Sequence, residues 1–412
     1  MLALAATQAE ARDPVLDWNE QTNLAIQATL ADPFNASRML ALESIAVLDT
    51  VKAIAGERGF LVQMPAPRGL DAAAAAAAAG HAMLVQLFPA RSAELDAALA
   101  ASLAALPVSV NRREAISFGA AVAYAVFALR ADDGSQAVGP TRGGAAPGEW
   151  RPTQPNFLPP LHPQWGAVKP FTMTVPSQFR PPGPPAPGTP VFREAAAMVA
   201  RLGAAKSTLR AAEQTEIARY WSDAIGTYAP AGHWNAIAAS VAAPRDLGLL
   251  AEAEMFAELN VAMADACIAM ADAKYTYWYW RPITAIRTGG DGMPAIPDWE
   301  PLLETPNHPS YISGHSSFSG AAALVLTAWF GGGAFSIGSQ SVPGVVRHFA
   351  SFTSAAEEAA MSRIYGGIHF AFENADGLAA GRKVGAWTLA AFNTKLGNPR
   401  LSLGCFPTTG HL

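Results

Sequence analysis

The sequence has little cysteine, little charge and no long apolar run. Only two of its 412 residues are cysteines, and neither lies in a CxxC pair, so no zinc site or disulfide framework is predicted. A single disulfide between Cys267 and Cys405 stays open, although Cys267 lies in an apolar helical stretch and is expected to be a buried small hydrophobe. Charged residues make up 15% of the chain and the net charge is -5. This balance gives no reason to expect nucleic acid or an acidic membrane surface as a partner.

No stretch of the chain is long enough to cross a bilayer. The best candidate, residues 321–330, is half of the ~20 residues that a spanning helix needs, and three glycines follow it. The first residues, MLALAATQAEA, resemble the tail of a secretion signal, although no basic region precedes them. We therefore expect a soluble protein with no integral membrane part, secreted or periplasmic rather than cytoplasmic.

Apolar residues at helical spacing dominate the rest of the chain. Hydrophobic residues make up 51% of it, and no run of alternating apolar and polar residues predicts a strand. Asp13 followed by Pro14 begins one helix, and Asp71 caps another that opens with eight alanines. Further helices are predicted at about residues 35–55, 92–103, 112–129, 192–202, 207–222, 234–242, 246–279, 315–330, 345–364 and 371–391. The predicted fold is all-α, with two packed helical bundles in a single domain.

Residues 138–190 differ from both halves of the chain because they are dense in proline and glycine. Such a composition supports neither helix nor central strand. The aromatic and aliphatic residues within it are too many for a free linker, so we expect a segment that wraps over the scaffold and forms one wall of a pocket. The expected organisation of the single domain, 1–412, is N-terminal helices over 13–135, this wrap, and a C-terminal bundle over 191–395.

The stretch KYTYWYWRP, residues 274–282, carries two cations and no acid. Lys274 and Arg281 are seven positions apart, which is two helical turns, so the spacing predicts that they share a face. Like charges on an apolar face are costly to desolvate unless an anion enters from outside. The alternative is an aromatic helix with two cations that reach solvent along its surface.

A second stretch, Ser313 to His315, has the pattern of an anion site at the start of a helix. Pro309 disfavours helix just before it, and a helix then opens around Gly314. Free N–H groups at a helix N-terminus attract oxyanions, Ser313 offers a hydroxyl, and His315 in the first turn would shuttle protons. The alternative is that the Ser–Gly pair is only a helix cap.

A third stretch, SRIYGGIHF, residues 362–370, holds a further cation and a further imidazole. Arg363 and His369 are six apart, which puts them on different faces of an unbroken helix. Gly366-Gly367 between them is expected to break the helix so that both side chains converge. The alternative is that Arg363 pairs with a surface acid and His369 is a satisfied core histidine.

Taken together, the three stretches resemble the site of the vanadium-dependent haloperoxidases, which share fold and site with the type 2 phosphatidic acid phosphatase superfamily. The family pattern is K-x6-RP, then SGH, then SR-x5-H, and the likeness covers about residues 220 to 390. It implies a vanadate cofactor at a site that phosphate also fits. In that site Lys274, Arg281 and Arg363 neutralise the equatorial oxygens, Ser313 and the Gly314 amide donate hydrogen bonds, His369 bonds the metal, and His315 is the acid–base residue.

The activity that this resemblance implies is the oxidation of halide by hydrogen peroxide to hypohalous acid, which halogenates organic acceptors. Lys274 would polarise the bound peroxide. One alternative is a soluble acid phosphatase in which His369 is the nucleophile. Another is a relative that keeps the scaffold but is idle or catalyses a rearrangement. The aromatic cluster, the wrap and the missing membrane helices favour the haloperoxidase, and the family also makes a homodimer an expectation.

Three more positions refine the resemblance. Asp223 in WSDAIGT matches the family segment whose acid supports the second arginine, so it is expected to orient Arg363, with an ordinary helix-terminal aspartate as the alternative. His308 falls where chloride-oxidising fungal relatives have Phe and bromide-oxidising algal relatives have His, which favours bromide and iodide, whereas the K-x6-R spacing is of the fungal type. Glu373 replaces the Asp usual four residues after the histidine, and this puts its supporting role in question.

Overall fold

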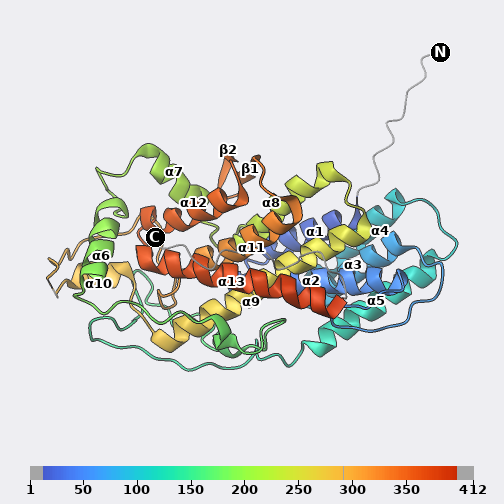
Figure 1. Ribbon diagram of the computed structural model, residues 1–412, viewed down its shortest axis with the longest axis horizontal. Coiled ribbons are helices and arrows are strands. Elements are labelled where there is room, and N and C mark those ends of the chain that lie inside the picture. Colours follow the sequence, from blue (N-terminus) through green and yellow to red (C-terminus); the bar gives the residue numbers. More distant parts are fainter. Residues whose placement is uncertain (1–12, 291, 397–412) are drawn as a thin grey trace, which may run out of the picture.

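The computed structural model describes residues 13–290 and 292–396 as an elongated bundle of helices (Figure 1). The prediction of an all-α fold is confirmed. The α-helices are α1 (Pro14–Ala28), α2 (Pro33–Ile54), α3 (Ala72–Leu87), α4 (Ser92–Ala105), α5 (Arg112–Leu129), α6 (Pro190–Leu202), α7 (Ala212–Tyr220), α8 (Ala229–Ala242), α9 (Leu249–Tyr277), α10 (Pro282–Thr288), α11 (Gly314–Phe330), α12 (Phe352–Tyr365) and α13 (Ala371–Leu396). Short 3-10 turns are η1 (Pro89–Arg91), η2 (Trp165–Ala167), η3 (Pro176–Phe179) and η4 (Ala243–Arg245).

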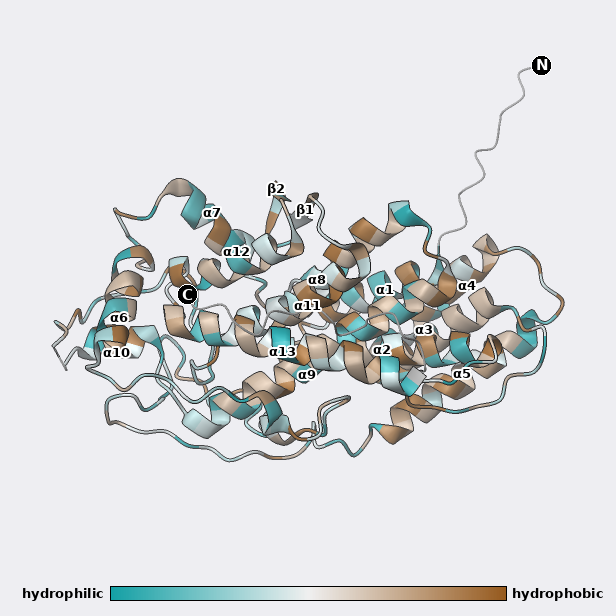
Figure 2. Cartoon of the chain, in the orientation of Figure 1, coloured by the Kyte–Doolittle hydropathy of each residue, from teal (hydrophilic) through white to brown (hydrophobic). Residues whose placement is uncertain are grey.

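The N-terminal helices begin where the sequence places a capping aspartate. The carboxylates of Asp13, Asp32 and Asp71 accept backbone N–H groups in the first turns of α1, α2 and α3. The alanines of α3 are almost all buried, which allows α2 and α5 to pack closely against it. Hydrophobic and hydrophilic residues follow each other along the same helices (Figure 2), as expected of helices with one face in a core.

One long helix, α9, connects this N-terminal group with the C-terminal helices. Helix α9 packs against α2 on one side and against α11 and α13 on the other. Helices α11 and α13 approach closely because glycines lie between them: a Cβ at Gly320 would lie 2.5 Å from the Leu378 carbonyl oxygen, and one at Gly381 would lie 2.2 Å from that of Ser317. Helices α9, α11 and α13 therefore form one closely packed layer, and some of the predicted site residues lie on it.

One predicted helix is wrong in its first part. Residues 345–349 belong to a hairpin of β1 (Phe335–Ser339) and β2 (Val342–Phe349), paired antiparallel, and α12 begins only at Phe352. The physical reason is that Pro343 and Gly344 follow a glycine-rich stretch, and the next residues alternate between exposed and half-buried along an edge. Ser351 caps α12 with its hydroxyl, so the helix cannot extend backward into the strand.

The Pro-rich segment lies along one long side of the molecule, below α9 in Figure 1, and is fixed to that helix. The carboxylate of Asp265 accepts the backbone N–H groups of Phe171, Thr172 and Met173 at 2.7–3.1 Å. Arg180 donates two hydrogen bonds of 2.6 Å to Asp272. These contacts place the segment as a wrap over the scaffold.

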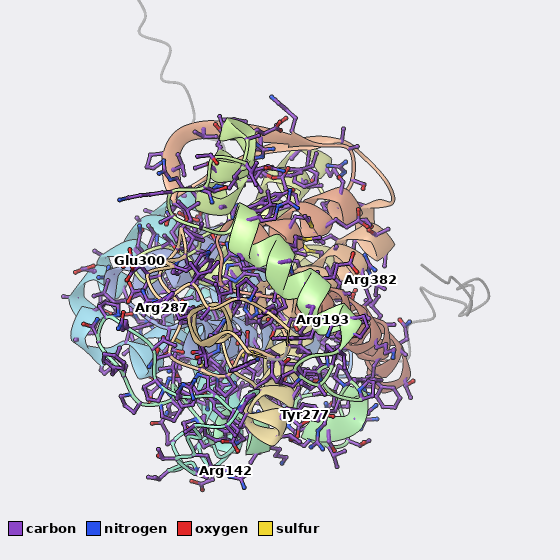
Figure 3. The ribbon with its side chains drawn as sticks, turned by 90° about the vertical axis from the view of Figure 1, so that its left-hand side faces the viewer. Arg142, Arg193, Tyr277, Arg287, Glu300 and Arg382 are labelled. Carbon is purple, nitrogen blue, oxygen red and sulfur yellow. The ribbon has the colours of Figure 1, made fainter. Side chains whose placement is uncertain are left out.

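Three tyrosines, two in the last turn of α9 and one just after it, hold the same wrap by their hydroxyl groups. Tyr275, Tyr277 and Tyr279 donate to the carbonyl oxygens of Leu161, Pro181 and Pro185, respectively. Tyr277 lies at the end of the molecule that faces the viewer in Figure 3. The aromatic cluster thus attaches the wrap to the scaffold. The spacing of its residues alone did not indicate this role.

Within the described ranges, no helix is both long and apolar enough to cross a membrane. Cys267 is buried in α9 as a free thiol. Two expectations fall outside the described residues: the secretion-signal tail at residues 1–12 and the pairing of Cys405.

Candidate oxyanion site

A cavity of about 470 Å³ lies where α9, α11, α12 and the wrap meet. Its walls come mainly from the start of α2, the wrap, the loop before α11 and the turn between α12 and α13. The residues that line it include Phe34, Thr153, Leu158, Leu161, Asp223, Met270, Thr305, His308, Gly314, His315, Phe318, Arg363 and His369. A cavity of this size accommodates a small organic molecule in addition to an anion.

Lys274 lies in the last turn of α9 and its ammonium group is fully buried. Its Nζ donates to the carbonyl oxygens of Pro309 and Ser310, each at 2.8 Å. The expectation that Lys274 and Arg281 share one helical face is wrong, because α9 ends at Tyr277 and Trp278 is left-handed, with φ 48°. The chain turns there, so the two cations converge from two different helices.

Arg281 is the N-cap residue of α10 and is also fully buried. Its guanidinium donates to the carbonyl oxygens of His308 at 2.8 Å and Ile368 at 2.9 Å. It also lies 2.9 Å from Nδ1 of His308 and 3.2 Å from Nε2 of His369. A planar group with five N–H donors suits this position, since it fixes both imidazoles at once.

His369 occupies the turn between α12 and α13, as the glycine pair predicts. Gly366 follows the last residue of α12, and Gly367 has φ 80°, a conformation that a side chain disfavours. Nδ1 of His369 lies 2.6 Å from the Glu373 carboxylate, which also accepts the Ser310 hydroxyl at 2.8 Å. Nδ1 therefore carries the proton, and Nε2 presents its lone pair toward Arg281.

The acid at position 373 therefore performs the supporting role that its difference from the family pattern put in question. The longer glutamate reaches the imidazole from the first turn of α13, four residues away, and also accepts the backbone N–H of Phe370 at 3.0 Å. The sequence feature that pointed to Glu373 was its position four residues after His369.

Arg363 lies in the last turn of α12 and approaches the cavity from the other side. Its guanidinium donates to the Ser362 hydroxyl at 2.9 Å and to the carbonyl oxygen of Trp221. Nη1 lies 3.5 Å from Nδ1 of His315. The opposite imidazole nitrogen, Nε2, is 3.8 Å from Asp223.

Asp223 forms its hydrogen bond with His233, whose Nδ1 is 3.0 Å away, whereas Arg363 acts on it through charge. The expected direct orientation of Arg363 by Asp223 is not what these contacts show, because α8 brings an imidazole closer to the carboxylate than the guanidinium. Sequence analysis assigned His233 no function, and a lone histidine in an apolar helix gave no signal that would have found it.

Ser313 and Gly314 form the helix start that the sequence predicts. Ser313 is the N-cap of α11. The Ser313 hydroxyl accepts two hydrogen bonds from Ser316, one from its backbone N–H at 3.5 Å and one from its side-chain hydroxyl at 2.9 Å. Gly314 lines the cavity, and a Cβ added there would meet only Met270, at 3.8 Å. The backbone at Gly314 is therefore open to a ligand from the cavity side.

The electrostatics of the site favour a bound anion. Three positive side chains, Lys274, Arg281 and Arg363, are at most 2% exposed, and the acids beside them are Glu373 and Asp223. Burial and the neighbouring Arg281 hold the pKa of Lys274 well below its ordinary value, and burial lowers the pKa of both arginines to about 10. These shifts measure the free energy cost of buried charge, which an entering oxyanion offsets.

The imidazoles are neutral in the same environment. Burial and the charges of neighbouring cations lower the pKa of His308 and His369 well below the ordinary range, and burial together with Arg363 lowers the pKa of His315 to about 3. Burial raises the pKa of Glu373 to about 7 despite the nearby Lys274. A neutral imidazole with its proton on Nδ1 is the form that bonds a metal through Nε2, and in His369 this Nε2 lies 3.2 Å from Nη1 of Arg281.

A helical scaffold with three buried cations, an open helix N-terminus and one supported imidazole defines a protein that binds a tetrahedral oxyanion. This donor set fits vanadate, because the cations match its oxygens and Nε2 of His369 offers one nitrogen to its metal. Within the described residues no group of three or more His, Cys, Asp or Glu side chains is placed to hold a metal ion.

Comparisons with known proteins agree with this class. Residues 254–398 match the family model of the second helical-bundle domain of vanadium chloroperoxidase. The vanadium chloroperoxidase of Curvularia inaequalis is 27% identical over 399 residues, which cover 77% of this chain and 64% of that enzyme's length. The chain therefore spans less than two thirds of that relative.

Solved structures give the same result over nearly the whole chain. The first bacterial vanadium-dependent iodoperoxidase to be crystallised is similar with a TM-score of 0.80 and 28% identity, over 91% of this chain and 95% of that one. A holo-type bacterial vanadium-dependent chloroperoxidase shares the fold, with a TM-score of 0.71, 18% identity, and coverage of 94% of this chain and 97% of that one. The chain is therefore similar to vanadium-dependent haloperoxidases in sequence over residues 254–398 and in fold over nearly its whole length.

Proposed function

We propose that this protein binds vanadate and oxidises halide with hydrogen peroxide to hypohalous acid, which halogenates an organic acceptor. The observation that carries the proposal is His369, whose Nδ1 is held by Glu373 while Nε2 lies 3.2 Å from the buried Arg281. The buried cations Lys274 and Arg363 act on the same ring through charge. Bound vanadate supplies a Lewis acid that activates peroxide toward attack by halide.

The residues of the chain would divide the remaining work. Lys274, Arg281 and Arg363 would balance the charge of the oxygens, and the fixed hydrogen bonds of Lys274 and Arg281 to backbone carbonyls pre-orient these groups before any ligand enters. His315 would accept and return the proton at its Nδ1, the nitrogen on the Arg363 side.

Bromide and iodide are the proposed substrates in preference to chloride. His308 lies at the cavity wall with its ring fixed between Arg281 and the edge of Phe34, 5.8 Å between ring centroids. A neutral imidazole there provides a polar contact for a large halide. The similarity to an iodoperoxidase supports the same preference.

The decisive experiment uses apo protein incubated with orthovanadate, hydrogen peroxide and bromide, iodide or chloride, with bromination of a phenolic dye as readout. We expect activity that requires vanadate, falls when phosphate competes, and is lost in His369→Ala. The control is His81→Ala, since His81 pairs with Asp96 on α4, away from the cavity. Unchanged halogenation in His369→Ala would show that the metal ligand is elsewhere.

The same preparation tests the phosphatase alternative. Hydrolysis of a phosphate ester without any halide oxidation would assign His369 as a nucleophile and overturn the proposal. Halide oxidation without ester hydrolysis would support it.

A further inference from the structure

A second cavity, of about 440 Å³, lies behind the first and shares one residue with it. It is lined by α8 and by the hairpin of β1 and β2, and its lining includes Asp223, Tyr228, His233 and Gln340. Asp223 also lines the site cavity, so its buried carboxylate forms part of the wall between the two spaces. No catalytic role assigned above uses this second cavity.

The polar atoms along this wall form an ordered series. Oδ1 of Asp223 lies 3.0 Å from Nδ1 of His233, and Oδ2 lies 3.8 Å from Nε2 of His315. Three of the buried atoms in the series, Asp223 Oδ2, His233 Nε2 and His315 Nε2, have no hydrogen-bond partner among the described residues. Orphaned polar atoms in a row are costly in a core, so they call for a functional reason.

The contact between His233 and Asp223 identifies which nitrogen of the outer imidazole carries its proton. Nδ1 of His233 lies 3.0 Å from a carboxylate oxygen, which accepts a hydrogen bond when Asp223 is ionised. Nε2 of the same ring is buried and meets no hydrogen-bond partner among the described residues, although the ring itself lines the second cavity. Nδ1 of His233 therefore carries the proton and donates it to Asp223.

We propose that His233 is a positioning residue for His315: it holds the Asp223 carboxylate between the two imidazoles, so that His315 keeps its proton on Nε2 and offers Nδ1 to the oxyanion. This inference rests on the acid–base role proposed for His315. His233 acts through Asp223 and does not touch the site cavity's ligand.

The groups around Asp223 determine the sign of the expected effect. It faces His233 from α8, His315 from α11 and Arg363 from α12, and its charge also raises the pKa of Tyr220 on α7. Burial alone would raise the pKa of Asp223, but His233 is first among the groups that lower it, followed by His315 and Arg363. Loss of the His233 donor should therefore raise the pH at which this carboxylate becomes protonated.

Two substitutions distinguish the effect of the His233 hydrogen-bond donor from the effect of packing its ring. The imidazole of His233 stacks on Trp221, with 4.7 Å between ring centroids and 27° between planes. His233→Phe keeps a stacked ring without a donor, whereas His233→Asn keeps an N–H near the position of Nδ1 without a ring. His81→Phe, at a histidine–carboxylate pair outside the site, is the matched control.

The first measurement is ¹⁵N NMR of His315 in the apo protein without vanadate or halide, so it gives an answer even if the proposed activity fails. We expect the Nε2–H tautomer in the native protein, in His233→Asn and in His81→Phe, and a mixture of tautomers in His233→Phe. The second measurement is the pH profile of bromide oxidation. We expect its acid limb to move upward by roughly one to three pH units in His233→Phe and to stay in place in the other two.

The remaining outcomes would overturn the proposal. An unchanged tautomer and acid limb in His233→Phe would show that the donor does not position His315. A change in His233→Asn, alone or together with His233→Phe, would assign the effect to packing of the ring on Trp221. If His233→Phe does not fold, His233→Leu, which also lacks the donor, takes its place in both measurements with the same expected results.

Discussion

At the scale of single residues, the carboxylate of Glu373 controls what the site imidazole offers to a ligand. It accepts from Nδ1 of His369, from the Ser310 hydroxyl and from the Phe370 amide. Glu373→Gln keeps the size of the side chain but removes its charge, so Nε2 of His369 becomes a weaker donor to metal. We expect vanadate affinity to fall by roughly 10- to 100-fold while the protein stays folded.

Vanadate titration of apo protein, followed by calorimetry, tests this expectation. Glu94→Gln is the control, because Glu94 forms an exposed ion pair with Arg91 on the surface. Equal affinities for the native protein and Glu373→Gln would show that the His369–Glu373 bond does not matter for the cofactor.

A second residue, Glu43 in α2, predicts how stability changes with pH. Burial raises its pKa from 4.5 to about 8. Between these values the folded protein holds a proton that the unfolded chain has released, so the free energy of unfolding falls as the pH rises. Glu43→Gln does not ionise, and we expect it to be more stable than the native protein at pH 9, by on the order of a few kcal/mol.

Denaturant unfolding at pH 5, 7 and 9 checks the sign. The advantage of Glu43→Gln should grow across this series. Curves for the two proteins that stay parallel from pH 5 to 9 would contradict the raised pKa.

At the scale of elements, the missing side chain of Gly314 at the start of α11 leaves space for a ligand beside the cavity. A methyl group at Gly314 meets only Met270, at 3.8 Å, whereas one at Gly320 in the same helix would lie 2.5 Å from a backbone oxygen of α13. We therefore expect Gly314→Ala to fold normally and lose vanadate affinity by about tenfold or more, because the methyl group enters the cavity beside the helix N-terminus. Gly320→Ala should instead lower the melting temperature, by the overpacking that typically costs about 1–3 kcal/mol.

Thermal unfolding and vanadate binding on the same two variants separate these effects. A large loss of stability in Gly314→Ala, or native vanadate affinity in it, would show that the backbone there is not part of the anion site.

The elements also show where sequence reasoning is reliable and where it is not. Capping aspartates and helical periodicity predict α1, α2 and α3 because local chemistry decides those helices. The hairpin at residues 335–349 was missed, because its two short strands lie at the edge of the bundle and have no strong sequence pattern of their own. The shared helical face of Lys274 and Arg281 was wrong because the left-handed turn at Trp278 depends on packing with the wrap, which no local spacing encodes.

The convergence of the three site stretches was predictable, because their residue types make sense together only around an anion. Glu373 was suspected from its spacing, whereas His233 was not, since its partner Asp223 is ten residues away across a turn. The contacts of a buried histidine depend on which helix faces it, and that is decided by the tertiary structure.

At the scale of the whole molecule, the apo protein stores mutual repulsion among buried cations that a ligand relieves. Burial is the first cause of the lowered pKa of Lys274, His308 and His369, and the neighbouring charges add to it. Lys274 and Arg281 each lower the pKa of the two imidazoles further, and Arg281 lowers that of Lys274. An oxyanion that binds only the folded state stabilises it, by about 2.7 kcal/mol at a concentration 100 times its Kd. We expect the melting temperature to rise with orthovanadate and, to a smaller extent, with phosphate.

Differential scanning calorimetry at constant ionic strength measures this, with sodium chloride as the control. Equal melting temperatures in vanadate and in chloride would mean that the three cations do not form a joint anion site.

The attachment of residues 138–190 to α9 allows the cavity lining and the oxyanion site to change independently in evolution. The wrap reaches the cavity with Thr153, Leu158 and Leu161, yet its own attachment is to Asp265, Asp272 and the tyrosines at the end of α9. Mutations of these cavity-lining residues can therefore alter which molecules enter the cavity, while the oxyanion site keeps its geometry. Relatives with this architecture would come to accept different organic molecules through changes in these lining residues, while the chemistry at the oxyanion site stays the same.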